Sequence, residues 1–359
     1  MMRIRLIAGL VYLVVFWTLA ACSPGQETAE QTSKETSVTT FALPDDPTDG
    51  DGYAPIKRFE AMGIPTDNPL TLAKAKLGRQ LYYDYRLSGD GSRSCYSCHV
   101  VEHGLTDGLP TAVGAYEKKL TRSSPTLWNI GYHSEFYWDG RANSLEKQAE
   151  AAWTGGNMGA KNVDSVVAVI NGIEGYRTQF QQVFGGEATV ASIPMALATY
   201  MRTIISDDTP WDRWQKGDSS AVDESTKRGY EVFKKAECAS CHSGVLLTDQ
   251  QFHNVGIGMD VEDYDVGRFK VTGLEPNRGA FKTPTLRDIA KSAPYFHNGS
   301  VATLDEAVRL LVNGGGKNTY LDEKLKPRDL SDAEIAELMA FLESLSQESS
   351  LDQRPNLPE

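Results

Sequence analysis

Apolar residues recur at helical spacing in several separate segments of this chain of 359 residues. In the first segment, Leu72, Leu77 and Leu81 repeat near one face of a helix that we expect over residues 73–83. The same spacing predicts further helices over residues 163–170, 193–205, 227–233, 304–312 and 333–345.

Capping residues support the last two of these helices. Thr303 and Glu306 form a capping box before residue 304, and Ser331 or Asp332 can cap the final helix. No convincing run of alternating apolar and polar residues indicates a strand. We therefore expect a mainly α-helical protein with long loops.

Three short segments of the first half recur in the second half. All three recur at one constant interval along the chain: residues 125–130 (PTLWNI) with 284–289 (PTLRDI), 137–140 (YWDG) with 296–299 (FHNG), and 144–146 (SLE) with 303–305 (TLD). Agreement in a fixed order indicates an internal duplication. We expect two small domains of one fold, joined near residues 207–220, where Pro, Gly and charged residues gather.

A cysteine motif is also repeated. It reads Cys95-x-x-Cys98-His99 in the first half and Cys238-x-x-Cys241-His242 in the second. C-x-x-C-H is the attachment signature of c-type haem: two thiols bind the two vinyl groups, and the adjacent histidine supplies an axial imidazole. A redox dithiol or half a zinc site is the alternative for a single copy. Two copies favour two covalently bound haem c groups, with His99 and His242 as proximal ligands.

The fifth cysteine, Cys22, follows the pattern of an export signal. Arg3 and Arg5 precede an apolar run, and the small residues Ala20 and Ala21 stand directly before Cys22. This predicts a lipoprotein signal peptide over residues 1–21, with Cys22 as the acylated first residue. A transmembrane anchor is the alternative, but the run is short for a span. We expect a periplasm-facing protein, lipid-anchored to a bacterial membrane.

The charge balance restricts the partners. Without Arg3 and Arg5, the 36 basic residues fall to 34, against 48 acidic ones. This acidic balance argues against binding of nucleic acid and suggests that a protein electron donor docks through a local patch. Residues 22–50 are rich in Ser, Thr, Glu, Gln and Pro without an apolar period, which predicts a disordered tether.

The order of motifs resembles that of the bacterial dihaem cytochrome c peroxidases and of the related MauG-type enzymes, which oxidise protein side chains. The resemblance covers about residues 70–345 and rests on residues 77–78, 95–99, 122–126, 136–141, 212–213, 238–242, 281–287 and 293–299. It implies two cytochrome c-like domains, each binding one haem. It also implies that the N-terminal haem reacts with peroxide, while the C-terminal haem passes electrons.

On this basis the chain divides into five parts: a signal peptide (1–21), a tether (22–50), an N-terminal peroxidatic haem domain (51–215), a C-terminal electron-transfer haem domain (216–345) and a tail (346–359). Trp138 takes the place of the tryptophan that lies between the two haems in the family. Without the resemblance, Trp138 would be interpreted as an aromatic residue of the apolar core.

The resemblance implies a distal glutamine and a distal glutamate in the pocket of the first haem. Gln148 matches the glutamine, and Asn157 falls at the position of the glutamate with a gap of one residue. An asparagine can hydrogen-bond to peroxide but cannot shuttle a proton. We therefore expect Asn157 to orient peroxide while water or another carboxylate moves the proton. The alternative is that both side chains are polar loop residues.

Many family members carry a histidine in the loop after the first motif, and it blocks the iron of the first haem until the other haem is reduced. The matching position holds Ala115, and His103 is badly placed to reach the opposite face of the iron. We therefore predict that the first haem is open without prior reduction of the second.

The sixth ligand of the second haem also departs from the family. Fourteen residues after His297, where the peroxidases place methionine and the MauG-type enzymes tyrosine, this chain has Leu311. Met259, Met339 or Tyr320 are the candidate replacements, or the iron stays five-coordinate.

Further ligands follow from the resemblance. A calcium ion between the domains would use the positions of Ser123, Ser292 and Pro294. Arg141 and Arg287 are candidates for pairing with haem propionates, and ordinary ion pairs are the alternative for both.

Three functions are compatible with these residues. The main expectation is a peroxidase that reduces hydrogen peroxide to water with electrons from a small cytochrome c or cupredoxin. The alternatives are a MauG-like oxidase of a protein or small molecule, and an electron-carrying dihaem cytochrome without enzymatic activity. Trp138 and Gln148 favour an enzyme. Many relatives dimerise, so a homodimer is a further expectation, although no residue pattern defines an interface.

Overall fold

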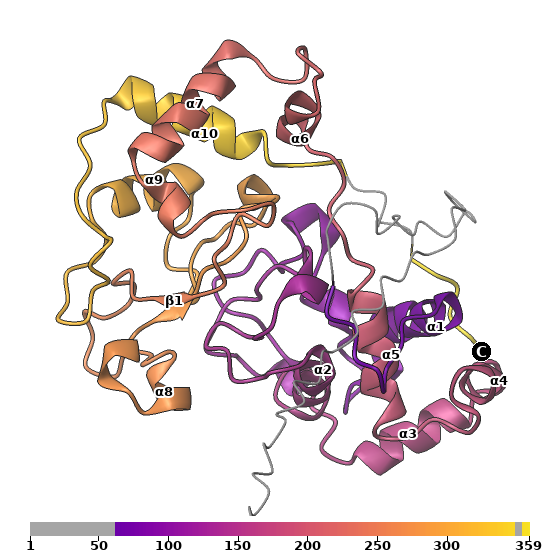
Figure 1. Cartoon of the computed structure of the whole chain (residues 1–359). Helices are drawn as coiled ribbons and strands as arrows, with labels where there is room; N and C mark the ends of the chain where they lie inside the picture. The colour runs from indigo at the N-terminus through magenta and orange to yellow at the C-terminus, as the bar shows by residue number, and fades with distance from the viewer. Residues whose placement is uncertain (1–61, 349–353) are drawn as a thin grey trace, which may run out of the picture. The chain divides into compact units, whose positions relative to one another are not determined.

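The computed structural model describes residues 62–348 and 354–359 (Figure 1). The predicted signal peptide, Cys22 and the tether lie outside the described residues. Within them, helices predominate, and regular strand is confined to an antiparallel pair, β1 (Phe252–His253) and β2 (Phe281–Lys282). The expectation of a mainly α-helical protein is confirmed. No helix in the described part of the chain is long and apolar enough to cross a membrane.

Ten α-helices occur in the described residues. They are α1 (Leu72–Tyr83), α2 (Leu145–Thr154), α3 (Val163–Asn171), α4 (Glu174–Phe184), α5 (Ser192–Met201), α6 (Pro210–Gln215), α7 (Glu224–Lys235), α8 (Phe269–Thr272), α9 (Leu304–Val312) and α10 (Asp332–Glu343). Each cysteine motif begins with a short 3-10 turn, Cys95–Ser97 and Cys238–Ser240.

The six predicted helices are all present, with α9 at its predicted bounds and α5 ending four residues early, at Met201. The expected caps are confirmed: Thr303 and Glu306 form a capping box, and Ser331, not Asp332, caps α10.

The helical spacing of apolar residues did not predict four of the helices, α2, α4, α6 and α8. In α2 the buried positions are Leu145, Ala149 and Trp153, and a single alanine between two large residues is a weak periodic signal.

The predicted linker near residues 207–220 is more ordered than expected, because it contains α6. Thr209 and Asp212 form a capping box at its start. Asp212 also accepts two hydrogen bonds from the guanidinium of Arg287, at 2.6 and 3.0 Å. Both side chains are largely buried. Arg287 is therefore held by a carboxylate of the protein, which supports the ion-pair alternative over pairing with a haem propionate.

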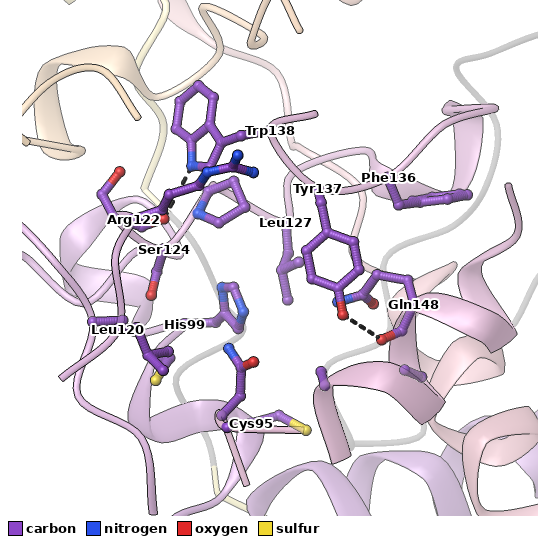
Figure 2. A pocket seen from close by; sticks show the side chains of 18 of the residues that line it. Cys95, His99, Leu120, Arg122, Ser124, Leu127, Phe136, Tyr137, Trp138 and Gln148 are labelled. Atoms are coloured by element: carbon purple, nitrogen blue, oxygen red, sulfur yellow. Dashed lines mark hydrogen bonds between the residues drawn. The ribbon is translucent and has the colours of Figure 1, made fainter. Parts of the chain in front are cut away.

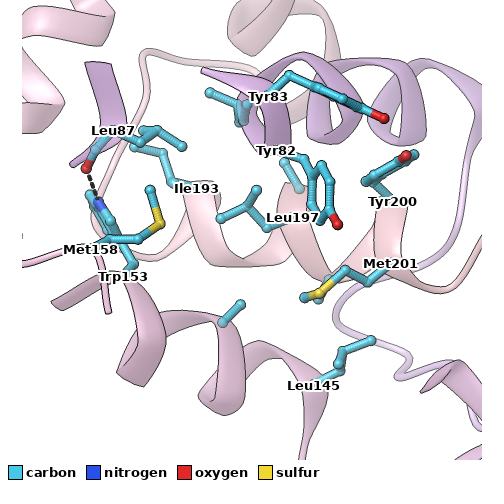
Figure 3. Close-up of a cluster of buried hydrophobic side chains, with 14 of the residues drawn as sticks. Tyr82, Tyr83, Leu87, Leu145, Trp153, Met158, Ile193, Leu197, Tyr200 and Met201 are labelled. Atoms are coloured by element: carbon cyan, nitrogen blue, oxygen red, sulfur yellow. Dashed lines mark hydrogen bonds between the residues drawn. The ribbon is translucent and has the colours of Figure 1, made fainter. Parts of the chain in front are cut away.

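Two apolar clusters form the core, one in each half of the sequence. The first joins α1, α2 and α5 and contains Tyr82, Leu145 and Leu197 (Figure 3). The second joins α6, α7 and α10 around Trp211 and Phe341.

Each cluster depends on one close helix crossing. Helix α1 packs against α5, and α7 packs against α10. Gly78 of α1 lies against the backbone of Ala196, and Gly229 of α7 lies against the backbone of Glu337. A Cβ atom at either glycine would overlap the facing carbonyl oxygen. These glycines therefore allow the two helices of each pair, α1 with α5 and α7 with α10, to approach each other closely.

The structure supports the internal duplication at the level of the backbone. Asn129 and Asp288, which are separated by the interval of the sequence repeat, both adopt left-handed conformations, with φ of 59° and 62°. Tyr137 and Phe296, separated by the same interval, do so with φ of 68° and 69°. Helices α2 and α9 also begin at matching residues, Leu145 and Leu304. The two halves thus share one local backbone fold over residues 125–146 and 284–305.

Gly229→Ala is expected to destabilise the protein by about 1–3 kcal/mol, because the new methyl group must push α7 away from α10. Unfolding of the haem-loaded protein by guanidinium, followed by circular dichroism, measures this loss. Gly186→Ala is the matched control, since nothing lies within 4 Å of its Cβ position, and it should change stability by less than about 0.5 kcal/mol. Equal stability of the two variants would contradict the role of the crossing.

Asp212→Asn is expected to cost about 3 kcal/mol, because it leaves the buried Arg287 guanidinium without its counter-charge. Burial opposes ionisation, but hydrogen bonds from Arg287 hold the pKa of Asp212 below its ordinary value. The stabilisation is therefore present at neutral pH and is lost as the pH falls through that lowered pKa. Urea unfolding at pH 7 measures the loss. Glu275→Gln, which breaks the exposed pair with Arg278, should have a much smaller effect, because solvent screens that pair.

Candidate functional site

The first cysteine motif lines a cavity of about 650 Å³, to which Cys95, Cys98 and His99 all contribute. The Nδ1 atom of His99 is 3.0 Å from the carbonyl oxygen of Leu105. Leu105 has a left-handed backbone with φ of 61°. Because the carbonyl accepts the Nδ1 proton, Nε2 is the nitrogen left to bind a metal. Burial lowers the pKa of His99, which keeps the imidazole in its neutral, metal-binding form.

The second motif repeats this arrangement in a cavity of about 270 Å³, lined by Cys238, Cys241 and His242. The Nδ1 atom of His242 is 3.0 Å from the carbonyl oxygen of Leu247, whose φ is 52°. The loops differ in length by one residue, yet both orient the imidazole through a left-handed leucine.

The thiols do not have the properties of a redox dithiol. Burial raises the pKa of Cys95 to about 12 and those of Cys98 and Cys238 to about 11. A thiol with a raised pKa is a poor nucleophile and a poor zinc ligand, because both roles need the thiolate. No disulfide joins these four cysteines. The two cysteine pairs line the cavities and fit thioether attachment.

The rest of the first cavity also fits a haem. Leu127, Phe136, Leu197 and Met201 supply apolar surface for a porphyrin face. Gln148, in α2, lines the same cavity, and its buried Oε1 has no hydrogen-bond partner among the described residues. An unpaired polar atom in such a place is costly unless a ligand satisfies it. The residues present thus fit a haem that leaves room for a small polar ligand.

Figure 2 draws His99 on one side of this cavity and the pair Tyr137 and Gln148 on the other. The hydroxyl of Tyr137 donates a hydrogen bond to the main-chain carbonyl of Gln148 at 3.0 Å. Asn157 also lines the cavity, and its carbonyl oxygen accepts a hydrogen bond from the N–H of Ala115 at 2.9 Å. The two residues predicted to be distal are therefore brought into one cavity with the proximal histidine.

His99 is the one histidine that lines the first cavity within the described residues. Ala115 is buried against the loop of Asn157 and Gly159. His103 lies against Gly108 and lines neither cavity. Among residues 62–348 and 354–359, no second histidine thus reaches the first cavity.

None of the three predicted replacements for the missing ligand lines the second cavity, whereas Leu311 does. The thioether of Met259 is contacted by the Asn254 amide at 3.0 Å. Met339 packs against the second apolar cluster, and the ring of Tyr320 lies 5.6 Å from the Arg278 guanidinium. These three side chains have packing or surface roles instead.

Two histidines to which the sequence analysis gave no role line the second cavity, His253 and His297. His253 is held between Asp249 and Asp322, and the hydrogen bonds that its ring donates to Cys241 and to these carboxylates raise its pKa to about 10. His297 stacks on Phe281 with ring centroids 3.6 Å apart, and burial lowers its pKa to about 4. The duplication offered a signal for His297, because it stands at the position that matches Trp138.

Trp138 lines both cavities. Its indole Nε1 donates to the carbonyl oxygen of Ser123 at 3.0 Å, and its own carbonyl accepts from the N–H of Lys282 at 2.8 Å. The first contact lies within the first half of the sequence, and the second joins the two halves. The tryptophan therefore forms part of the wall that the cavities share.

The three positions predicted for calcium, Ser123, Ser292 and Pro294, all line the second cavity. The Ser123 hydroxyl donates to the carbonyl of Phe296 at 2.8 Å, and that of Ser292 donates to the carbonyl of Ile289 at 3.1 Å. Both hydroxyls are therefore engaged in hydrogen bonds to the protein backbone.

Arg141 lines the first cavity, but its guanidinium is already paired with Asp139 at 3.0 Å. The same guanidinium lies 3.4 Å from the centroid of the Tyr137 ring, and almost half of the side chain is exposed. Asp139 also accepts from Arg122 at 2.8 Å.

Two family models match this chain. Residues 72–220 match the di-haem cytochrome c peroxidase family, and residues 226–346 match the cytochrome c family. The chain is 39% identical over 308 residues to the methylamine utilization protein MauG of Methylorubrum extorquens, covering 85% of this chain and 87% of that protein. It is 36% identical over 339 residues to the cytochrome-c peroxidase IdrP1 of Denitromonas iodatirespirans, covering 85% and 90%.

A solved structure has the same fold. It is the crystal structure of a MauG-like protein associated with microbial copper homeostasis, with a TM-score of 0.75 and 32% sequence identity over 81% of this chain and 94% of that chain. The likeness extends over both cavities, and the two C-x-x-C-H motifs account for two haem c groups. The chain therefore belongs to the family of dihaem cytochrome c peroxidases and MauG proteins.

Proposed function

We propose that this protein is a dihaem cytochrome c peroxidase that reduces hydrogen peroxide to water with electrons from a small cytochrome c or cupredoxin. The observation that carries the proposal is the first cavity, where His99 is opposed by the unpaired Oε1 of Gln148 and by no second imidazole within the described residues. The likeness to a protein named as a cytochrome-c peroxidase supports it.

A comparison of matched positions supports different roles for the two haems. At the interval of the sequence repeat, Gln148 in the first cavity corresponds to Ala307 in the second, and Tyr137 corresponds to Phe296. At these two matched positions the duplicated fold thus carries polar groups in the first cavity and apolar groups in the second. Polar groups are needed to bind peroxide and to move its protons, so the first cavity is the one suited to react with peroxide.

When bound, the haem supplies an iron centre that takes an oxygen ligand and exchanges electrons. Side chains of this protein bind and orient the peroxide. His99 presents Nε2, Gln148 accepts a hydrogen bond from peroxide through Oε1, and the amide of Asn157 orients the peroxide. Trp138, in the wall shared by both cavities, provides the route by which electrons pass between them.

A MauG-type oxidation is the second candidate. The observations that favour it are Ala115 in place of a blocking histidine and Leu311 in place of a methionine ligand, together with the likeness to the MauG protein of M. extorquens. Such an enzyme would use peroxide to oxidise a protein or small-molecule substrate, with both haems taking part in the electron transfer.

The wider organisation follows the same proposal. The haem domains span residues 51–215 and 216–345, which the separate family matches to each half support. Cys22 carries a lipid after removal of residues 1–21, so that the tether of residues 22–50 holds the enzyme on the periplasmic side of a bacterial membrane. A calcium ion held by Ser123, Ser292 and Pro294 and a homodimeric state rest on the family resemblance.

Mixing the half-reduced protein with hydrogen peroxide and a reduced small cytochrome c is expected to give continuous oxidation of the donor. Stopped-flow absorbance of the donor measures the turnover. A long-lived oxidised dihaem state that leaves the donor reduced would select the MauG-type function. No spectral change on adding peroxide would leave only an electron carrier.

Trp138→Phe is expected to slow donor-dependent turnover by at least about tenfold, which corresponds to about 1.4 kcal/mol in the barrier, because the route between the cavities loses its indole. Haem content and the first reaction with peroxide should be unchanged. Trp214→Phe is the control, because Trp214 lines neither cavity. Equal slowing in both variants would argue against a route through Trp138.

The fully oxidised protein is expected to show a five-coordinate or water-ligated, high-spin first haem before any reduction. Electron paramagnetic resonance of the resting protein measures this spin state. The physical reason is the absence of a second imidazole from the described lining of the first cavity. A resting spectrum with two bis-histidine, low-spin haems is the opposite outcome.

A further inference from the structure

The first cavity holds a phenol beside the distal glutamine that the proposed function does not yet use. The hydroxyl of Tyr137 is hydrogen-bonded to the main-chain carbonyl of Gln148 at 3.0 Å, and both residues line the cavity (Figure 2). The phenol is therefore fixed beside Gln148, the residue whose unpaired Oε1 atom would meet a peroxide.

The fold does not need this hydroxyl. In the second half the matching residue is Phe296, which adopts the same left-handed backbone, with φ of 69° against 68° for Tyr137. The bridges that flank the two turns, Phe136 with Ala142 and Tyr295 with Val301, are also the same. A phenylalanine is thus sufficient to build the turn, and a hydroxyl is present only in the half that also has Gln148.

Other groups that carry protons are poorly suited to serve the peroxide. Asp139 is the one carboxylate that lines the first cavity in the described part of the chain, and it is buried and paired with both Arg122 and Arg141. Tyr82 donates its hydroxyl to the carbonyl of His99 at 3.2 Å, which ties it to the proximal side.

Three lysine side chains also belong to the lining of the first cavity. Lys118, Lys119 and Lys270 line the cavity but are exposed to solvent. Asn157, which also lines the cavity, has no ionisable group. Within the described lining, Tyr137 is the ionisable side chain that bonds directly to the Gln148 residue.

We propose that Tyr137 is a catalytic acid for peroxide reduction, whose hydroxyl turns from the Gln148 carbonyl to the peroxide and delivers a proton. This inference rests on the proposed function. One hydrogen peroxide takes two electrons and two protons and gives two waters. The O–O bond breaks, the electrons come from the small redox protein, and Tyr137 gives its proton to the oxygen that leaves. Solvent supplies the second proton and then restores the phenol.

The surroundings suit a group that must be protonated at rest and ionise for a short time. Burial raises the pKa of Tyr137, so the phenol carries its proton at neutral pH. The guanidinium of Arg141, 3.4 Å from the ring centroid, favours the phenolate that is left after the transfer. The guanidinium is itself held in place by Asp139.

The test compares two oxidants in the haem-loaded, full-length protein. Hydrogen peroxide needs a proton on its leaving oxygen, whereas peracetic acid loses acetate, which leaves without one. Tyr137→Phe should slow the reaction with hydrogen peroxide by about 100-fold or more, the usual contribution of a general acid. The reaction with peracetic acid should keep its rate. Tyr116→Phe, an exposed tyrosine, is the matched control and should change neither rate.

Stopped-flow haem absorbance measures both rates, and pyridine haemochrome analysis checks that each variant carries two haems. An unchanged rate with hydrogen peroxide in Tyr137→Phe would overturn the assignment. Equal slowing with both oxidants would also overturn it, because it would show a structural role. Failure of the unmodified protein to react with either oxidant would instead refute the proposed function, which separates the two ideas.

Discussion

One hydrogen bond in each half, from the proximal imidazole to a leucine carbonyl, is the constraint on which the site depends. In both halves Nδ1 lies 3.0 Å from that oxygen, so Nε2 is directed into the cavity beside the two thiols. Leu105 and Leu247 reach this position only because each adopts a left-handed backbone, a conformation that costs energy in a residue with a side chain. The rest of each loop must stabilise this backbone conformation. The close helix crossing in the same half stabilises the domain to which the loop belongs.

The duplication gives the same backbone twice and lets the side chains divide the work. The left-handed turns, the paired bridges and the starts of α2 and α9 all repeat at one fixed interval along the chain. On this shared frame, Tyr137 and Gln148 face the first cavity, while Phe296 and Ala307 stand in the second. At these two positions the side chains are polar in the first half and apolar in the second, and the backbone of the turn and the start of the helix stay the same.

The shared wall joins the two halves through bonds that no single half can form. Trp128 donates to Asp288 at 2.9 Å, Ser123 donates to the Phe296 carbonyl, and Arg122 pairs with Asp265. Trp138 lies in this wall and lines both cavities. A buried hydrogen bond between charged or polar groups is costly to break when one partner is left behind. These contacts therefore favour a fixed geometry between the cavities, which a proposed electron route through Trp138 needs.

The sequence by itself determined the cofactor, the fold class and the family. Two C-x-x-C-H motifs name haem c because thioether attachment is a local matter of residue type and spacing, and helical periodicity is local as well. The family resemblance, not local spacing, placed Gln148, Asn157 and Trp138 in the site, and all three line the first cavity. Only the tertiary structure decided which groups meet there. Arg287 is taken by Asp212, the three candidate replacement ligands lie outside the second cavity, and His253 lines it instead. Tyr137 likewise meets the Gln148 carbonyl only after α2 packs against the turn that precedes it. Such pairings depend on how helices and loops pack in three dimensions, and no spacing along the chain encodes them.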